Sequence, residues 1–226
     1  MTYVITHKMI EMSDDTKKLS FISSFSENID KEIVSILMAW ITHLRQEEFY
    51  VMRNFIQQTM KPSPLEYILD YNAIETSNKC FFNTLTILNL NNLICRIQAN
   101  VIAHGNIKKA YTASRKKRHK YAHETLANIF GGGTGFQTSK TQSTYYRLNL
   151  LIYWLTKKLG VWNDINIGNS LLPCNDLVFL NAYKKGFIKK PMKSNLTNTI
   201  ALTKIAKDIY GKDDFYTLYE KLKSYD

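Results

Sequence analysis

The chain has 226 residues, of which 45% are hydrophobic and 22% charged, an ordinary composition for a globular protein. A chain of this length buries a substantial core without disulfides or metal ions, which excludes a small scaffold that depends on cross-links. Thirty lysines and arginines stand against 19 aspartates and glutamates, and the formal net charge of +11 attracts polyanions. Nucleic acid is the polyanion that this charge indicates first, and an acidic membrane surface is the alternative.

The cysteines and the apolar runs indicate the compartment. Cys80, Cys95 and Cys174 are odd in number and far apart, which favours a reducing compartment over a disulfide framework. The first eight residues lack a basic segment followed by a long apolar run, and the apolar run 148–155 is too short to span a bilayer. We therefore expect a soluble, cytoplasmic protein with no membrane partner, and no obligate protein partner is inferred.

Hydrophobic residues recur at three- and four-residue steps along most of the chain, as in amphipathic helices. In chain order, this spacing predicts helices over residues 30–60, 65–71, 85–103, 107–130 (as one or two basic helices), 141–159, 175–185, 196–210 and 213–223. Strand-like alternation is nowhere sustained, so the predicted class is all-α.

Capping and breaking residues mark the ends of these helices. The expected N-terminal caps are Asn28 or Asp30, Ser63, Thr141 or Ser143, and Thr197. The expected ends are Pro62 and Pro64 for the first helix, and Gly105, Gly160, Gly186 and Gly211 for later ones.

A glycine cluster, Gly131, Gly132, Gly133 and Gly135, is the one strong internal break. It separates an N-terminal helical portion, 1–130, from a C-terminal helical portion, 131–226, which we expect to pack as one structural unit. The nearby Lys140 does not complete a phosphate-binding loop, because Ser139 stands where that motif requires glycine. A hinge or a turn is the favoured interpretation of the cluster.

Basic residues form the candidate nucleic-acid-binding set. The densest run is Arg115-Lys116-Lys117-Arg118-His119-Lys120, whose self-repulsion a phosphate backbone would relieve. The alternative is a solvated helix face. The candidate set comprises Arg115, Lys116, Lys117, Arg118, Lys140, Arg147, Lys184 and Lys185, with Lys108, Lys109, Lys189, Lys190 and Lys193 as smaller additions.

His119 and His123 are spaced to face one metal ion from a helix. The adjacent basic run repels a cation, and no third ligand is indicated. We expect no metal site and no cofactor.

Two groups of residues resemble the signature of a known family. The C-terminal group comprises Ser143-Thr144-Tyr145-Tyr146-Arg147-Leu148-Asn149, Trp154, Gly160-Val161-Trp162 and Ser170-Leu171-Leu172-Pro173-Cys174-Asn175-Asp176. The N-terminal group comprises Asp30-Lys31-Glu32-Ile33, Ala39, Arg45-Gln46 and Pro64. Together they resemble, over about residues 20–220, an uncharacterised bacterial family common in the Bacteroides group. That family is distantly similar to archaeal 8-oxoguanine DNA glycosylases.

The resemblance implies a two-lobed helical domain of the helix-hairpin-helix DNA glycosylase type. Such enzymes bind duplex DNA through its backbone and extrude one nucleotide. It also implies that Asp176 is catalytic, either stabilising the sugar cation that develops as the base departs or activating the attacking water. Asp176 is expected at the N-terminal cap of the following helix, and the alternative is that it is this cap and has no catalytic role.

The sequence departs from the family at Tyr146, where a Schiff-base-forming lysine is expected. Tyrosine cannot form that intermediate, so lyase activity is not expected. The glycine-containing hairpin is also indistinct, with Gly160-Val161 and Ile167-Gly168 as partial candidates. The function implied is a DNA-binding protein that excises a damaged purine with water, with Asp176 and Tyr146 at its site. The alternatives are a non-catalytic nucleic-acid-binding helical protein and a helical protein-interaction module.

Overall fold

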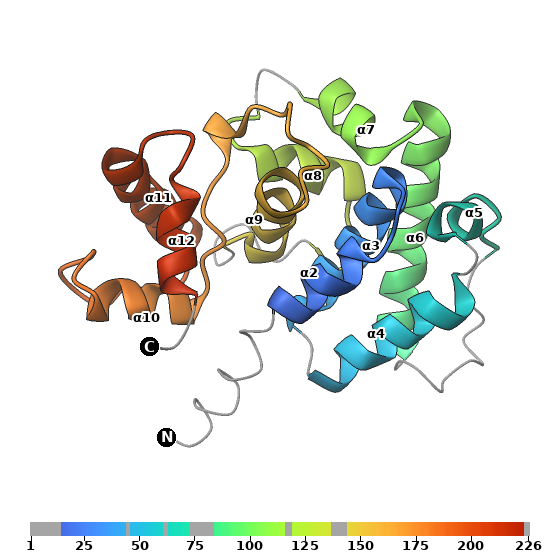
Figure 1. Ribbon diagram of the computed structural model, residues 1–226, viewed down its shortest axis with the longest axis horizontal. Coiled ribbons are helices and arrows are strands. Elements are labelled where there is room, and N and C mark those ends of the chain that lie inside the picture. The colour runs from blue at the N-terminus through green and yellow to red at the C-terminus, as the bar shows by residue number, and fades with distance from the viewer. Residues whose placement is uncertain are drawn as a thin grey trace. The chain divides into compact units, whose positions relative to one another are not determined.

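The computed structural model describes residues 15–43, 46–60, 63–72, 84–115, 119–136 and 144–223. Every regular element in these ranges is helical, which confirms the all-α class (Figure 1). The elements are α2 (Asp15–Ser23), α3 (Asn28–Trp40), η1 (Ile41–His43), α4 (Gln46–Thr59), α5 (Pro64–Leu69), α6 (Thr84–His104), α7 (Ile107–Ser114), α8 (Ala122–Phe130), α9 (Tyr146–Tyr153), η2 (Trp154–Lys158), η3 (Ile167–Asn169), α10 (Asp176–Lys184), α11 (Leu196–Tyr210) and α12 (Tyr216–Leu222). None of these helices is both long enough and apolar enough to cross a membrane.

The described chain divides into two compact units. The N-terminal unit comprises residues 16–43, 46–60, 63–72, 84–115, 119 and 124–136. The C-terminal unit comprises Asp15, residues 120–123 and residues 144–223. The glycine-rich segment 131–136 is therefore part of the N-terminal unit.

Helix α3 is the central helix of the N-terminal unit. Its residues from Ile33 to Ala39 are all fully buried, as expected of a helix that is apolar around most of its circumference. It contacts α4 and α5, and α6 contacts α5 and α7. The buried carboxylate of Glu32 accepts a hydrogen bond from the backbone N–H of Ile107 at 3.0 Å, which ties α3 to the start of α7.

The single helix expected over residues 30–60 is wrong, because α3 ends at Trp40 and α4 begins at Gln46. A 3₁₀ turn, Ile41–His43, follows α3. The Thr42 hydroxyl donates to the Met38 carbonyl at 2.9 Å, a side-chain bond that competes with regular helix geometry. No glycine or proline marks this break, so the hydrophobic spacing runs through it.

The expected cap of the first helix is also wrong. Glu27 is the N-cap of α3 and makes no side-chain cap bond, and Asp30 lies inside the helix. The Asp30 carboxylate instead accepts the Leu65 backbone N–H at 2.9 Å and the Ser63 hydroxyl at 3.2 Å. Asp30 thus helps to cap α5, whose own N-cap, Ser63, is confirmed.

The glycine cluster forms a fixed loop against helices of its own unit. The Asn92 side chain of α6 donates to the Gly133 carbonyl at 3.0 Å, and the Trp40 indole donates to the Thr134 carbonyl. Gly135 has φ +76°, and a Cβ at this position would lie 3.2 Å from the Trp40 Nε1 atom. The segment is therefore a packed turn, one of the two alternatives that the sequence left open.

In the C-terminal unit, α12 contacts both α10 and α11 (Figure 1). The largest fully buried side chains of this unit are Trp154, Trp162, Tyr153, Tyr219, Phe179 and Phe215. The helix expected over 141–159 begins at Tyr146, and its last turn, η2, is π-helical. Thr141 and Ser143, its expected caps, lie outside the described residues. Helix α11 is capped by Asn195 rather than by Thr197, since the Asn195 side chain accepts the Asn198 N–H at 2.9 Å.

Candidate functional site

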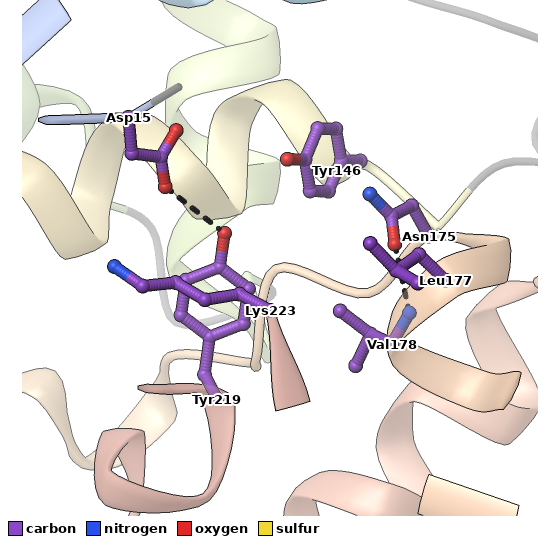
Figure 2. Close-up of a pocket in the computed structure, with 7 residues that line it drawn as sticks. All are labelled: Asp15, Tyr146, Asn175, Leu177, Val178, Tyr219 and Lys223. Atoms are coloured by element: carbon purple, nitrogen blue, oxygen red, sulfur yellow. Dashed lines mark hydrogen bonds between the residues drawn. The ribbon is translucent and has the colours of Figure 1, made fainter. Parts of the chain in front are cut away.

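Tyr146 lies in a small polar pocket of the C-terminal unit (Figure 2). The residues that line this pocket are Asp15, Tyr146, Asn175, Leu177, Val178, Tyr219 and Lys223. Its cavity has a volume of about 10 Å³, which is close to the space of one water molecule. Pockets that hold small organic ligands measure roughly 300–1,000 Å³. The pocket as it stands therefore has no room for a nucleobase.

The pocket brings together one carboxylate and two phenols. The Tyr219 hydroxyl donates to the Asp15 carboxylate at 3.3 Å, and Figure 2 shows the Tyr146 hydroxyl turned toward the same region. Burial raises the pKa of Tyr146 far above its ordinary value, and the negative charge of Asp15 raises that pKa further. Burial likewise raises the pKa of Tyr219, with Tyr146 and Asp15 acting in the same direction. Both phenols therefore stay protonated at neutral pH and act as hydrogen-bond donors.

Asp176 is not among the pocket residues. It is the first residue of α10, its side chain is exposed, and its carboxylate accepts a hydrogen bond from the Ser194 hydroxyl. The N-cap of α10 is the preceding residue, Asn175, whose side-chain oxygen accepts the Val178 N–H at 3.0 Å. The helix N-cap proposed for Asp176 is thus occupied by Asn175, and Asn175 is the one of the two that reaches the pocket.

Of the polar residues that line the pocket, sequence reasoning named only Tyr146 as a site residue and missed Asp15, Asn175, Tyr219 and Lys223. Asn175 and Asp176 directly precede an apolar run, which is a typical N-cap signal. This signal could have predicted Asn175 as the N-cap of α10. Asp15 and Tyr219 are 204 residues apart, so no local pattern joins them.

The predicted nucleic-acid-binding residues lie on or next to different helices and differ in exposure. Arg115 is exposed and follows the last residue of α7 in the N-terminal unit. Arg147 is half-buried on α9, where burial lowers its pKa to about 10, so its guanidinium is still charged at neutral pH. Lys184 and Lys185 are exposed at the C-terminal end of α10 and just after it. Lys116, Lys117, Arg118 and Lys140 lie outside the described residues.

The C-terminal unit carries a lysine-rich surface that begins at the end of α10. We use the name α10 lysine surface for five exposed lysines: Lys184, Lys185, Lys189, Lys190 and Lys193. The sequence from Leu177 to Lys207 adds Lys204 and Lys207 and contains no aspartate or glutamate. After Asp176, the first residue of α10, the rest of the helix and the segment that follows it carry lysines and no acidic residue as far as Lys207.

The two histidines considered for a metal have other interactions. A ring nitrogen of His119 lies 3.0 Å from the Thr125 hydroxyl. The His123 ring is buried and stacks on Tyr145, with ring centres 4.3 Å apart. Across the described ranges, no three histidine, cysteine, aspartate or glutamate side chains gather closely enough to hold a metal ion.

Comparison with known proteins identifies a family for most of the chain. The family described as "Protein of unknown function (DUF2400)" matches residues 18–216. No curated protein and no solved structure matches the chain.

Proposed function

The chain belongs to the DUF2400 family of proteins of unknown function, and we propose that it binds double-stranded DNA through the α10 lysine surface. The observation that carries this proposal is the run of five exposed lysines between residues 184 and 193, in a stretch that has no acidic residue. Within the described residues, Lys184, Lys189, Lys190 and Lys193 make no ion pair. Their charges are therefore available to an external anion.

DNA suits this surface because of its charge density. Duplex DNA carries one negative charge per about 1.7 Å of helix axis, and a protein gains affinity by releasing the counterions condensed on it. A single small anion would engage one or two of the lysines, whereas a phosphate backbone engages several at once.

The resemblance to helix-hairpin-helix DNA glycosylases adds a fold type and a class of partner to this proposal. The helical class and the two compact units support that type. Because those enzymes hold duplex DNA through its backbone, a lysine-rich surface is the kind of contact that the type requires.

The test is the salt dependence of duplex binding. The variant Lys184→Gln/Lys189→Gln/Lys190→Gln/Lys193→Gln is compared with the matched variant in which the same four lysines become arginine. Fluorescence anisotropy of a labelled duplex, measured from 50 to 200 mM salt, gives the slope of log affinity against log salt. Each lost phosphate contact reduces that slope by about 0.9.

We expect the glutamine variant to bind weakly with a shallower slope, and the arginine variant to bind like the unmodified protein. A glutamine variant with unchanged affinity and slope would overturn the proposal.

Excision of a damaged purine by water is the second candidate function. The observation that favours it is that Asp176, Leu180 and Lys184 are four residues apart on α10 and all exposed. DNA held at Lys184 along this face would pass the Asp176 carboxylate. Duplexes with single lesions, including 8-oxoguanine, are assayed for base release, which Asp176→Asn should abolish. Tight binding of these duplexes without release would remove this candidate and leave DNA binding standing.

A further inference from the structure

The exposed face of α10 carries two large apolar side chains beside the lysines. Leu180 is 37% exposed and Tyr183 is 42% exposed. The opposite face packs inward, where the buried Asn181 side chain donates to the Leu222 carbonyl of α12 at 2.8 Å. Leu180 and Tyr183 therefore point away from the core of the C-terminal unit.

Among the tyrosines of this unit that the structure describes, Tyr183 is the one whose side chain has no interaction with another side chain. Tyr153 is buried against Tyr216 and Tyr219, with ring centres 4.9 Å and 5.1 Å away. Across the part of the chain that the structure describes, the Tyr183 side chain makes no hydrogen bond and no ring contact, and only its backbone carbonyl accepts hydrogen bonds, from the N–H groups that follow it. The fold of the unit thus gains little from an aromatic ring at position 183.

The positive charge around Tyr183 indicates which class of ligand could contact its ring. Tyr183 directly precedes Lys184 and Lys185, and Lys189 and Lys190 follow within seven residues. A second copy of this chain, with its net charge of +11, would be repelled by that surface. A ligand that is both polyanionic and rich in flat aromatic faces is a nucleic acid, and an aromatic side chain in a basic groove is the usual platform for its bases.

An intact duplex hides the faces of its bases in the stack, so only unpaired bases can meet the ring. We propose that Tyr183 stacks on a base of single-stranded DNA, and that the α10 lysine surface binds a single strand more tightly than a duplex of equal length. This inference rests on the proposed DNA binding and specifies which form of DNA the surface prefers. Electrostatics alone predicts the reverse order, because a single strand has the lower charge density and the shallower salt slope.

The test compares a 12-nucleotide single strand with the 12-base-pair duplex that contains it, both carrying 2-aminopurine and a terminal fluorophore. Stacking on Tyr183 should quench the 2-aminopurine fluorescence in the single strand. Tyr183→Ala should weaken single-strand binding about 5- to 150-fold, the range that corresponds to loss of one stacked base, and should leave duplex binding unchanged. Tyr183→Phe should keep both the affinity and the quenching, because the ring remains.

The matched control is Ile209→Ala on α11, since Ile209 is another exposed apolar side chain of the same unit, at 54% exposure. We expect it to bind both DNAs like the unmodified protein. If neither DNA binds, the proposed function fails together with this inference. If the duplex binds but Tyr183→Ala changes neither affinity, or lowers both equally, only the stacking role of Tyr183 is overturned.

Discussion

The carboxylate of Asp30 lies on α3 and yet completes the start of another helix. It is 7% exposed and accepts the Leu65 N–H, one of the N-terminal backbone donors that α5 cannot pair within itself. The Leu65 N–H is partly buried, and a donor shielded from water that loses its acceptor keeps part of its desolvation cost, so removing this bond should cost more than removing a fully exposed cap.

Asp30→Ala should lower the free energy of unfolding by about 1–3 kcal/mol, because the Leu65 N–H and the Ser63 hydroxyl lose their shared acceptor. Urea denaturation followed by circular dichroism measures this change. The control is Asp70→Ala, which removes an exposed carboxylate from the other end of α5 and should cost no more than about 0.5 kcal/mol. Equal losses in the two variants would contradict a capping role for Asp30.

At the scale of elements, the turn after α8 depends on the backbone conformation of single glycines. Gly135 has φ +76°. A Cβ atom at this position would lie 3.2 Å from the indole nitrogen of Trp40. That indole is the group that donates to the Thr134 carbonyl. A side chain at Gly135 would both strain the backbone and disturb this hydrogen bond.

Gly135→Ala should lower the free energy of unfolding by about 1–3 kcal/mol, from the left-handed backbone and the crowded indole. The matched control is Gly132→Ala in the same loop, where φ is not in the left-handed region and no atom lies within 4 Å of an added Cβ. That change should be neutral or stabilising by up to about 1 kcal/mol. Thermal unfolding of both variants separates the two sites, and a destabilised Gly132→Ala would argue against this account of the loop.

At the scale of the whole molecule, stability at alkaline pH depends on buried groups that resist ionisation. Burial raises the pKa of Tyr146, Tyr219 and Cys174 above their ordinary values of 10.0, 10.0 and 9.0. The folded chain holds these protons more tightly than the unfolded chain does. Their contribution to stability is complete below pH 9 and declines as the pH rises through the range in which the unfolded chain ionises.

The free energy of unfolding should therefore fall above about pH 9–10, by up to about 1.4 kcal/mol per pH unit for each group. Urea denaturation at pH 8, 9, 10 and 11 measures this fall. The double variant Tyr146→Phe/Tyr219→Phe should show a shallower fall, because the ionisations of two deeply buried groups are removed. A free energy that is the same at pH 8 and pH 11, or an unchanged slope in the double variant, would contradict the prediction.

The spacing of hydrophobic residues along the chain was enough to predict most of the helices. The ends at Gly105, Gly160, Gly186 and Gly211 are confirmed, with positive φ at each, because a left-handed residue after a helix is a local requirement that glycine meets best. The break between α3 and α4 was missed, because it depends on the Thr42 hydroxyl and on side-chain packing rather than on a helix-breaking residue.

The candidate site divides in the same way. The sequence by itself determined the helical class and the uncompensated lysines after α10, since periodicity and charge are properties of neighbouring residues. Only the tertiary structure decided that Asn175 rather than Asp176 reaches the pocket of Tyr146, and that Asp15 meets Tyr219 there. The physical reason is that a pocket is made by side chains from distant parts of the chain, whose meeting depends on how the helices pack.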